Sequence, residues 1–403
     1  MINVGMDWAR NEHYFVVLSE DGKELAKGTV AHSEPALCEF RTQLAKLEPR
    51  VEQVRVIIEM HTGGLLAWLR KQGYPLFVIA AKSSESAREV FRPSGSKDDR
   101  HDALTLAWLG QMDAACLREV PPPSERARAL LQLVEARDKL VQDRVGIMHR
   151  IRALLAEFSP ELSKACNDFN RIWQRELLAA YPSQRQLGKA RWEHITAICR
   201  RCGKKTIKLL RAACDTKPIS SSPTDMEFAE QQVRWLLEDL ETRTQRIEQI
   251  EAKLEVLIAD HPNKHLAASL PIRGIVTRAT LLGMMDEARN FTWEELAAHW
   301  GVAPVTKKSG THREVHRRRA CDHHICRFLI QFAFNTMRVK GSWAEDYYRS
   351  KRPKDKPDNN SKEHYTTLRE LAKKWVKILH AMWRNNTEFD EKLHQENRRK
   401  NAA

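Results

Sequence analysis

The N-terminal part of the chain alternates strand and helix patterns, and this order restricts the fold more than any other feature of the sequence. Short apolar runs predict strands, and apolar residues at three-four spacing predict helices. In chain order, we predict strands over Ile2–Trp8, His13–Ser19 and Glu24–Ala31, a helix over Glu34–Leu47, a strand over Val51–Met60, a helix over Gly64–Gln72, a strand over Pro75–Ala80 and a helix after residue 97. Asp21-Gly22 is a hairpin-turn signal between the second and third strands. The pattern therefore predicts an α/β domain.

This order of elements is that of the ribonuclease-H fold, although order alone gives weak support because many α/β folds begin similarly. Pro121-Pro122-Pro123 predicts a domain boundary, so we assign residues 1–120 to the α/β domain. Beyond it, Ser124–Phe158 and Met226–Ile258 have long amphipathic helical patterns. They suit an antiparallel helical hairpin, an intermolecular coiled coil, or faces buried within one domain. Residues 124–262 form this helical, coiled-coil region, with an unassigned insert at 160–222.

The last third of the chain is predicted to be mainly helical. Residues 263–345 form a compact unit with helices over Leu270–Met285, Thr292–Trp300 and Cys321–Val339. Residues 346–403 form a basic extension, with a charged loop over Lys351–Asn360 and a helix over Lys362–Trp383 before a polar end. The predicted fold class is thus α/β plus α.

Positive charge is concentrated at the C-terminal end. The whole chain carries +14, and residues 301–403 hold 24 Lys and Arg against 12 Asp and Glu, an excess of 12. Such a surface attracts phosphate backbones by counterion release, but charge cannot separate DNA from RNA, and a merely soluble basic tail is the alternative. No apolar run is long enough to cross a bilayer and no secretory leader is visible, so we expect a cytoplasmic, nucleoid-associated protein without membrane partners.

The eight cysteines do not favour a zinc site. Cys199 and Cys202 have CxxC spacing, and a second cluster comprises Cys321, His323, His324 and Cys326. Zinc needs four ligands around one centre, and these clusters lie over 100 residues apart without complete partner sets nearby. We expect reduced thiols that pack like other small side chains.

Acidic residues stand where the predicted strands and a helix end or begin. Asp7 ends the first strand, Glu59 ends the buried strand, and Asp99 and Asp102 share a face at a helix start. Asp98 and Asp102 could also share that face, so spacing alone does not choose between Asp98 and Asp99. Each acid alone could be a turn, ion-pair or N-cap residue. Together they favour a site for two Mg²⁺ ions, which would clamp a phosphodiester; Mn²⁺ is an alternative ion.

These segments resemble the DEDD transposases of the insertion sequence 110 and 1111 group. The N-terminal resemblance rests on Asn3 to Trp8, on Ile58-Glu59 with Thr62-Gly63-Gly64, and on Lys97-x-Asp99-x-x-Asp102-Ala103. A second block comprises Leu270-Pro271-x-x-Gly274, Phe291 and Ala297, Trp300 to Pro304, and Ser309-Gly310 with the basic run to Arg319. The resemblance covers roughly residues 1–340.

The resemblance implies a RuvC-like metal domain, a helical dimerisation region and a C-terminal transposase domain. Its acids match Asp7, Glu59, Asp99 and Asp102, and its nucleophilic serine matches Ser309. It further implies cutting and rejoining of double-stranded donor and target DNA through a serine–phosphate link. The partners would be a structured guide (bridge) RNA and further copies of the chain, in a dimer to tetramer that joins one subunit's acids to another's serine.

Two departures from the family pattern concern the phosphate-binding turns. Gly274-Ile275-Val276 lacks the second glycine of the usual Gly-Ile-Gly turn, and His312–Arg319 lacks further glycine. Ser309 alone could be a polar turn residue, since a serine hydroxyl needs help to act as a nucleophile. We assign the basic neighbours to nucleic-acid contacts; they are Lys97, Arg100, Lys307, Lys308, His312, Arg313, Arg317, Arg318 and Arg319.

Two other functions remain open at this point. A metal-dependent nuclease, such as a junction resolvase, would hydrolyse DNA with water and form no covalent link to the protein. A non-catalytic RNA- or DNA-binding scaffold would use only the basic surface.

Overall fold

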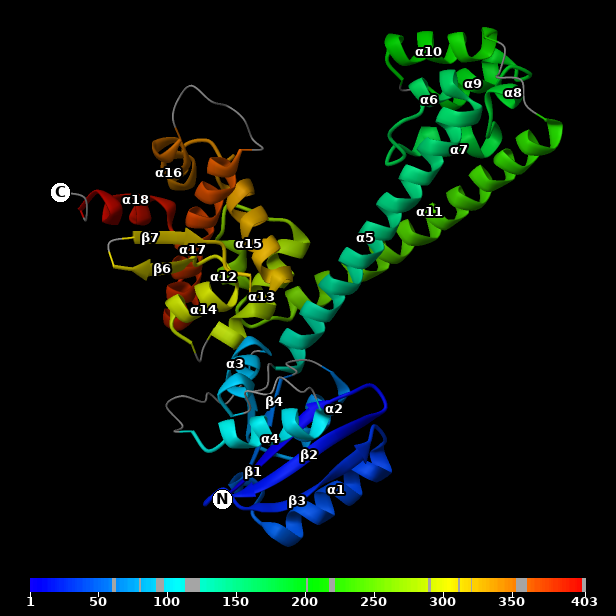
Figure 1. Cartoon of the computed structure of the whole chain (residues 1–403). Coiled ribbons are helices and arrows are strands. Elements are labelled where there is room, and N and C mark those ends of the chain that lie inside the picture. The colour runs from blue at the N-terminus through cyan, green and yellow to red at the C-terminus, as the bar shows by residue number, and fades with distance from the viewer. Residues whose placement is uncertain are drawn as a thin grey trace. The chain divides into compact units, whose positions relative to one another are not determined.

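The computed structural model describes residues 1–59, 63–79, 81–91, 98–112, 124–200, 202–216, 222–288, 291–310, 312–319, 321–352 and 361–400. The chain divides into two compact units, which comprise residues 1–124 with 286–403, and residues 125–285. Figure 1 shows the sheet of the N-terminal part, the long paired helices of the second unit and the helical C-terminal part.

A five-stranded sheet forms the core of the N-terminal part. Its elements are β1 (Ile2–Trp8), β2 (Glu12–Ser19), β3 (Glu24–Ala31), α1 (Glu34–Leu47), a 3-10 turn (Val51–Gln53), β4 (Val54–Ile58), α2 (Gly64–Lys71), β5 (Leu76–Val78), α3 (Ala81–Phe91) and α4 (Asp99–Leu109). The strand order is β3-β2-β1-β4-β5. The first three strands are antiparallel, whereas β4 is parallel to β1 and β5 is parallel to β4. The predicted order of elements from β1 to β5 is confirmed.

Two predictions for this part need correction. The strand predicted over Val51–Met60 begins only at Val54, because residues 51–53 form a 3-10 turn, and Met60 lies outside the described residues. Helix α3 was not predicted, since its sequence has too few apolar residues to show a helical stripe.

Different helices cover the two faces of the sheet. On one face, Val4 and Met6 of β1 belong to a core that also contains the apolar residues of α1 and α2. On the other face, Val16 of β2 packs with Ala103 and Ala107 of α4. Since side chains alternate along a strand, Asn3, Gly5 and Asp7 of β1 face α4.

The second unit is built on two long antiparallel helices, α5 (Glu125–Phe158) and α11 (Pro223–Ala259), which lie side by side (Figure 1). Arg137 pairs with Glu251 at 3.0 Å, and Arg243 pairs with Asp143 at 3.8 Å. The pairing confirms the two predicted long helices, which form a helical hairpin within one chain. An intermolecular coiled coil stays a prediction.

The insert between these helices folds into five short helices at one end of the hairpin: α6 (Pro160–Ala165), α7 (Ile172–Ala180), α8 (Gln184–Leu187), α9 (Trp192–Ile198) and α10 (Lys204–Asp215). Their apolar residues share a core with Ile151 of α5 and Leu237 of α11. Cys166 and Cys199 lie in this core, and burial raises the pKa of Cys199 to about 12. Helices α12 (Lys264–Ala268) and α13 (Ile275–Ala288) follow.

The C-terminal part has a core rich in tryptophan. Its elements are α14 (Trp293–His299), β6 (Val305–Ser309), β7 (His312–His316), α15 (His323–Thr336), α16 (Trp343–Lys351), α17 (Lys362–Asn385) and α18 (Glu391–Lys400). Trp300, Trp343 and Trp375 are fully buried, and the indole of Trp375 donates a hydrogen bond to Thr336 at 2.9 Å. No helix in the described ranges is long and apolar enough to span a membrane.

Four predictions in the C-terminal third need correction. The hairpin of β6 and β7 was missed because its residues are mostly polar on both faces. Helix α16 was not predicted, and α18 replaces the predicted polar end. The helix predicted from Leu270 begins at Ile275, after Pro271, whose missing amide and ring disfavour an earlier start. Most of the loop predicted over Lys351–Asn360 lies outside the described residues.

Candidate active site

Two of the predicted acids lie at the same edge of the N-terminal sheet. The parallel register pairs Met6 of β1 with Ile58 of β4, so Asp7 and Glu59 stand next to each other at the carboxyl ends of their strands. Ile57, two residues before Glu59, packs with Leu106 of α4. Both acids are therefore placed on the sheet face that α4 covers.

Helix α4 brings its first turn to this edge. A Cβ at Gly5 would lie 1.9 Å from the carbonyl oxygen of Ala103, and one at Gly110 would lie 3.0 Å from Oδ1 of Asn3. The helix thus runs antiparallel to β1, with its C-terminus beside Asn3. Its N-terminus, with Asp99 and Asp102, lies toward the strand end that carries Asp7.

The three aspartates of this helix start have different surroundings. Asp98 is the N-cap: its side chain accepts a hydrogen bond from the backbone amide of Arg100 at 3.3 Å. Asp99 is exposed in the first turn. Asp102 is only 6% exposed, and both its oxygens accept hydrogen bonds from Nη1 of Arg88 at 2.9 and 3.0 Å.

This arrangement places the segments that carry the four carboxylates at one edge of the domain, but the carboxylates do not converge on one point. In the described ranges, no three acidic, histidine or cysteine side chains are grouped as a metal site. Arg88 instead neutralises Asp102, as a cation must when a carboxylate is buried. The donors are all carboxylate oxygens, which are the ligands that Mg²⁺ and Mn²⁺ prefer, so they fit a hard divalent cation better than zinc.

Ser309 is the last residue of β6, at the tip of an exposed hairpin. It pairs with His312 across the turn. Gly310 has φ +57°, and a Cβ added there would meet no described atom within 4 Å, so the tip is open. Lys307 pairs with Glu314, and directly paired residues share one face of a hairpin. Ser309, His312, Lys307 and Glu314 therefore lie on one face.

Glu314 organises this face. Its carboxylate binds Nε2 of His312 at 3.1 Å and Nε2 of His316 at 2.8 Å. Hydrogen bonds from His312 and then His316 lower the pKa of Glu314. Sequence reasoning missed both Glu314 and Arg88. The alternation His312-x-Glu314-x-His316 could have indicated a strand, whereas Arg88 lies in the helix that was not predicted.

The other predicted basic residues are spread over several places. Lys308 lies on the hairpin face opposite Ser309, and Arg100 pairs with Glu24 at 3.7 Å. Arg318 donates to the backbone oxygen of Ala303 at 3.4 Å. Arg319 is exposed, and Arg317 lines a hollow with residues of α15 and α17. Lys97 and the side chain of Arg313 lie outside the described part.

Two transposase family models match separate parts of the chain. The DEDD transposase family model of the insertion sequence 110 type, described as "Transposase", matches residues 4–160. The model described as "Transposase IS116/IS110/IS902 family" matches residues 264–349. The first match contains all four predicted acids, and the second contains Ser309.

Full-length relatives are known from insertion elements. A mini-circle putative transposase for IS117 from Streptomyces coelicolor is 24% identical, over 96% of this chain and 95% of the relative. An uncharacterized 43.6 kDa protein of insertion element IS110 from the same organism is 26% identical, over 97% of this chain and 96% of the relative. A 42 kDa protein of insertion element IS900 from Mycobacterium paratuberculosis is 25% identical, over 96% of each. The chain belongs to the IS110 family of DNA transposases, whose DEDD domain indicates dependence on a divalent metal ion.

Proposed function

We propose that the protein cuts and rejoins the DNA strands of an insertion element and its target with a serine nucleophile and a DEDD metal site. The observation that carries the proposal is the register of β1 and β4, which sets Asp7 beside Glu59 at the edge where α4 begins. In this ribonuclease-H-like, RuvC-like domain, Asp7, Glu59, Asp99 and Asp102 would hold Mg²⁺. Bound ions would offset charge on the attacking and leaving oxygens of a phosphodiester.

Ser309 would form the covalent link to DNA. Its Oγ bonds to phosphorus, one P–O ester bond of the strand breaks, and the leaving oxygen takes up a proton. Attack by a DNA hydroxyl on the phosphoserine reverses the step and releases Ser309. The open tip beside Gly310 allows a phosphate to approach the hydroxyl.

His312 and Glu314 would activate this serine. A nucleophilic hydroxyl needs a base, and that base is commonly oriented by a third group. His312 lies opposite Ser309 in the register, and Glu314 binds its ring. We infer that His312 accepts the proton of Ser309 and that Glu314 orients the imidazole. Lys307, on the same face, would contact the DNA backbone.

A gel assay with labelled double-stranded DNA tests the covalent step. The full-length protein with Mg²⁺ should yield a protein–DNA adduct on denaturing gels, and Ser309→Ala should abolish it. Ser33→Ala is the matched control, because Ser33 is also exposed and its hydroxyl makes no capping hydrogen bond. Free cleaved ends with normal Ser309→Ala activity would instead establish the hydrolytic nuclease. Unchanged activity of Asp7→Ala and Glu59→Ala, together with indifference to Mg²⁺, would establish a non-catalytic scaffold.

We further propose that a structured guide RNA directs the reaction. The basic C-terminal part supports contact with nucleic acid, and pairing between guide and target would carry most of the sequence specificity. Sequencing of nucleic acid that copurifies with the protein tests this. An RNA encoded beside the gene supports guidance, whereas random cellular RNA contradicts it.

The active assembly is proposed to be a dimer to tetramer. On α11, Phe228 is 57% exposed, Trp235 51% and Val256 64%. These residues are spaced by 7 and 21 positions, so they share one heptad position on the helix. Light scattering should show Phe228→Ser/Trp235→Ser shifting the protein toward monomer, and an unchanged mass would contradict this interface.

A further inference from the structure

A hollow of about 450 Å³ in the C-terminal part is lined by several cationic side chains. Arg317 comes from the segment after β7, His323 and Arg327 from α15, and Tyr365 and Arg369 from α17. No Asp or Glu belongs to its described lining. Three guanidinium groups therefore surround one space without a carboxylate to balance them.

Arg369 shows the cost of this arrangement most clearly. Its side chain is half-buried, and its buried Nε has no hydrogen-bond partner among the described residues. Burial, and then the charge of Arg317, lowers the pKa of Arg369. Buried guanidinium groups are normally paired, because an unpaired buried charge is costly. An anion would supply the partner that is missing among the described residues.

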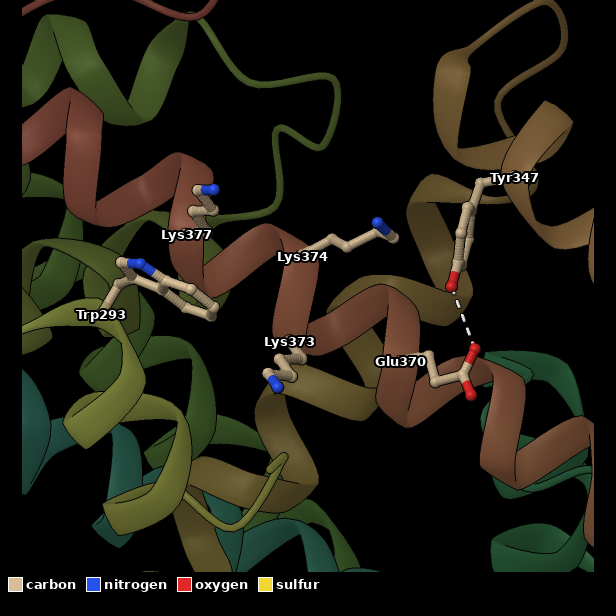
Figure 2. A pocket seen from close by; sticks show the side chains of 6 residues that line it. All are labelled: Trp293, Tyr347, Glu370, Lys373, Lys374 and Lys377. Atoms are coloured by element: carbon tan, nitrogen blue, oxygen red, sulfur yellow. Dashed lines mark hydrogen bonds between the residues drawn. The ribbon is translucent and has the colours of Figure 1, made fainter. Parts of the chain in front are cut away.

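A neighbouring basic hollow shows what a compensated site looks like. Figure 2 shows Lys373 and Lys377 of α17 on either side of the Trp293 ring, with their ammonium groups 5.6 and 5.2 Å from its centroid. Glu370 lines the same hollow and accepts a hydrogen bond from Tyr347 at 3.0 Å. The aromatic face of Trp293 thus stabilises these lysines within the protein, and a carboxylate lines the same hollow. The arginine hollow has neither kind of compensation in its described lining, apart from the exposed ring of Tyr365.

We propose that the arginine hollow binds a backbone phosphate of nucleic acid. Guanidinium groups bind phosphate oxygens through paired N–H donors, which an ammonium group cannot do. Arg317 directly follows β7, whereas Ser309 stands at the other end of the hairpin. The four residue steps from His312, the partner of Ser309, to His316 already span about 13 Å. The bound phosphate is therefore not the one that Ser309 attacks. The hollow holds the same nucleic acid at a second point and fixes its path past the hairpin.

This inference deepens the proposed function, since it rests on the protein acting on nucleic acid. Binding is measured without metal, so it does not depend on strand cleavage. If the unaltered protein binds neither DNA nor RNA, the proposed function fails. If it binds but the arginine substitutions change nothing, only this inference fails.

Fluorescence anisotropy of the full-length protein in EDTA provides the test. The probes are a labelled 30-base-pair DNA duplex and a labelled RNA hairpin, titrated at several salt concentrations. Arg327→Gln/Arg369→Gln should weaken binding of at least one probe about tenfold and lower the slope of log affinity against log salt by about 1.8, as expected for two lost contacts. The probe that loses affinity identifies the occupant as DNA or RNA. The matched control, Lys373→Ala/Lys377→Ala, removes the same charge from the basic hollow of Figure 2.

Thermal unfolding is a second measurement, because a residue that only stabilises the fold and a residue that binds phosphate should change the Tm differently. Arg369→Gln removes a like-charge contact with Arg317, so the Tm should stay the same or rise while affinity falls. A lower Tm with unchanged affinity would assign Arg369 to the fold alone and overturn the proposal. Equal losses in the arginine and lysine variants would indicate bulk charge and overturn it too. So would an acidic peptide probe that alone responds to the arginine substitutions.

Discussion

Replacing Gly5 with alanine would place a methyl group where the backbone of α4 already lies. The added Cβ would be 1.9 Å from the carbonyl oxygen of Ala103 and 2.3 Å from the amide nitrogen of Ala107. Ordinary contacts begin near 3.4 Å, so α4 must move away from β1 by roughly 1.5 Å. The atoms nearest to the added Cβ all belong to the backbone of α4, so no side-chain rotation can relieve the clash.

The energetic cost follows from this displacement. Overpacking of a core costs about 1–3 kcal/mol, and a backbone obstacle places Gly5→Ala at about 3 kcal/mol. The same movement shifts the first turn of α4, with Asp99 and Asp102, relative to Asp7. Since a misplacement of about 1 Å can reduce a rate about 100-fold, DNA cleavage should fall by about that factor.

Hydrogen exchange of the full-length protein measures the effect locally. Amides of β1 should exchange roughly 100-fold faster in Gly5→Ala, which corresponds to about 3 kcal/mol of lost protection. The control is Gly28→Ala in β3, where the new Cβ would lie 3.5 Å from the Phe15 ring, an ordinary contact. Equal protection of β1 in the two variants would refute the close packing of α4 on Gly5, and with it the position of the acids.

Three further predictions concern carboxylates. Asp98→Ala should destabilise α4 by about 1 kcal/mol, whereas Asp98→Asn should be nearly neutral and keep cleavage activity, because asparagine also caps helices. Thermal melting and DNA-cleavage assays check this. Loss of activity in Asp98→Asn would make Asp98 a metal ligand instead of a cap. Arg88→Gln leaves Asp102 without its cation, so Mg²⁺ should raise the Tm of this variant more than that of the unaltered protein. An equal rise in Tm for the two proteins would contradict a metal ion at Asp102. Burial alone would raise the pKa of Glu230, but hydrogen bonds from Arg185, Ser183 and Gln186 outweigh it and lower the pKa below its usual 4.5. The stabilisation of the fold by ionised Glu230 is therefore present above about pH 4.5 and is lost as pH falls through the lowered pKa. Glu230→Gln should flatten this part of the curve of Tm against pH. An unchanged curve would show that another group titrates there.

The sequence predicted those features that depend on residues close together in the chain. The ends of β1, β3 and α1 agree with their predicted bounds, because apolar periodicity and turn residues set them directly. Asp7 and Glu59 could be placed at strand ends for the same reason. Their adjacency depends on the parallel pairing of β1 with β4, which only the resemblance to a known fold could suggest.

The features that were missed depend on contacts between distant residues. Helix α3 has few apolar residues of its own, yet it supplies Arg88 to Asp102. The hairpin of β6 and β7 is mostly polar on both faces, so hydrophobic patterning could not reveal it. The arginine hollow joins residues 317, 327 and 369, which no local motif connects.

The proposed metal-binding carboxylates and the proposed nucleophile, Ser309, lie on elements that differ in rigidity. Asp7 is the next-to-last residue of β1, in which Val4 and Met6 are fully buried, so its backbone is held in the sheet. Carboxylates that share metal ions need this rigidity, because small displacements change the coordination. Ser309 stands on a two-stranded hairpin, and a hairpin of this size has little stability of its own. A nucleophile that binds a DNA strand, carries it and then releases it gains from such a support. Stiffening the hairpin tip should therefore slow strand exchange more than the first cut, and equal slowing of both steps would argue against this division of roles.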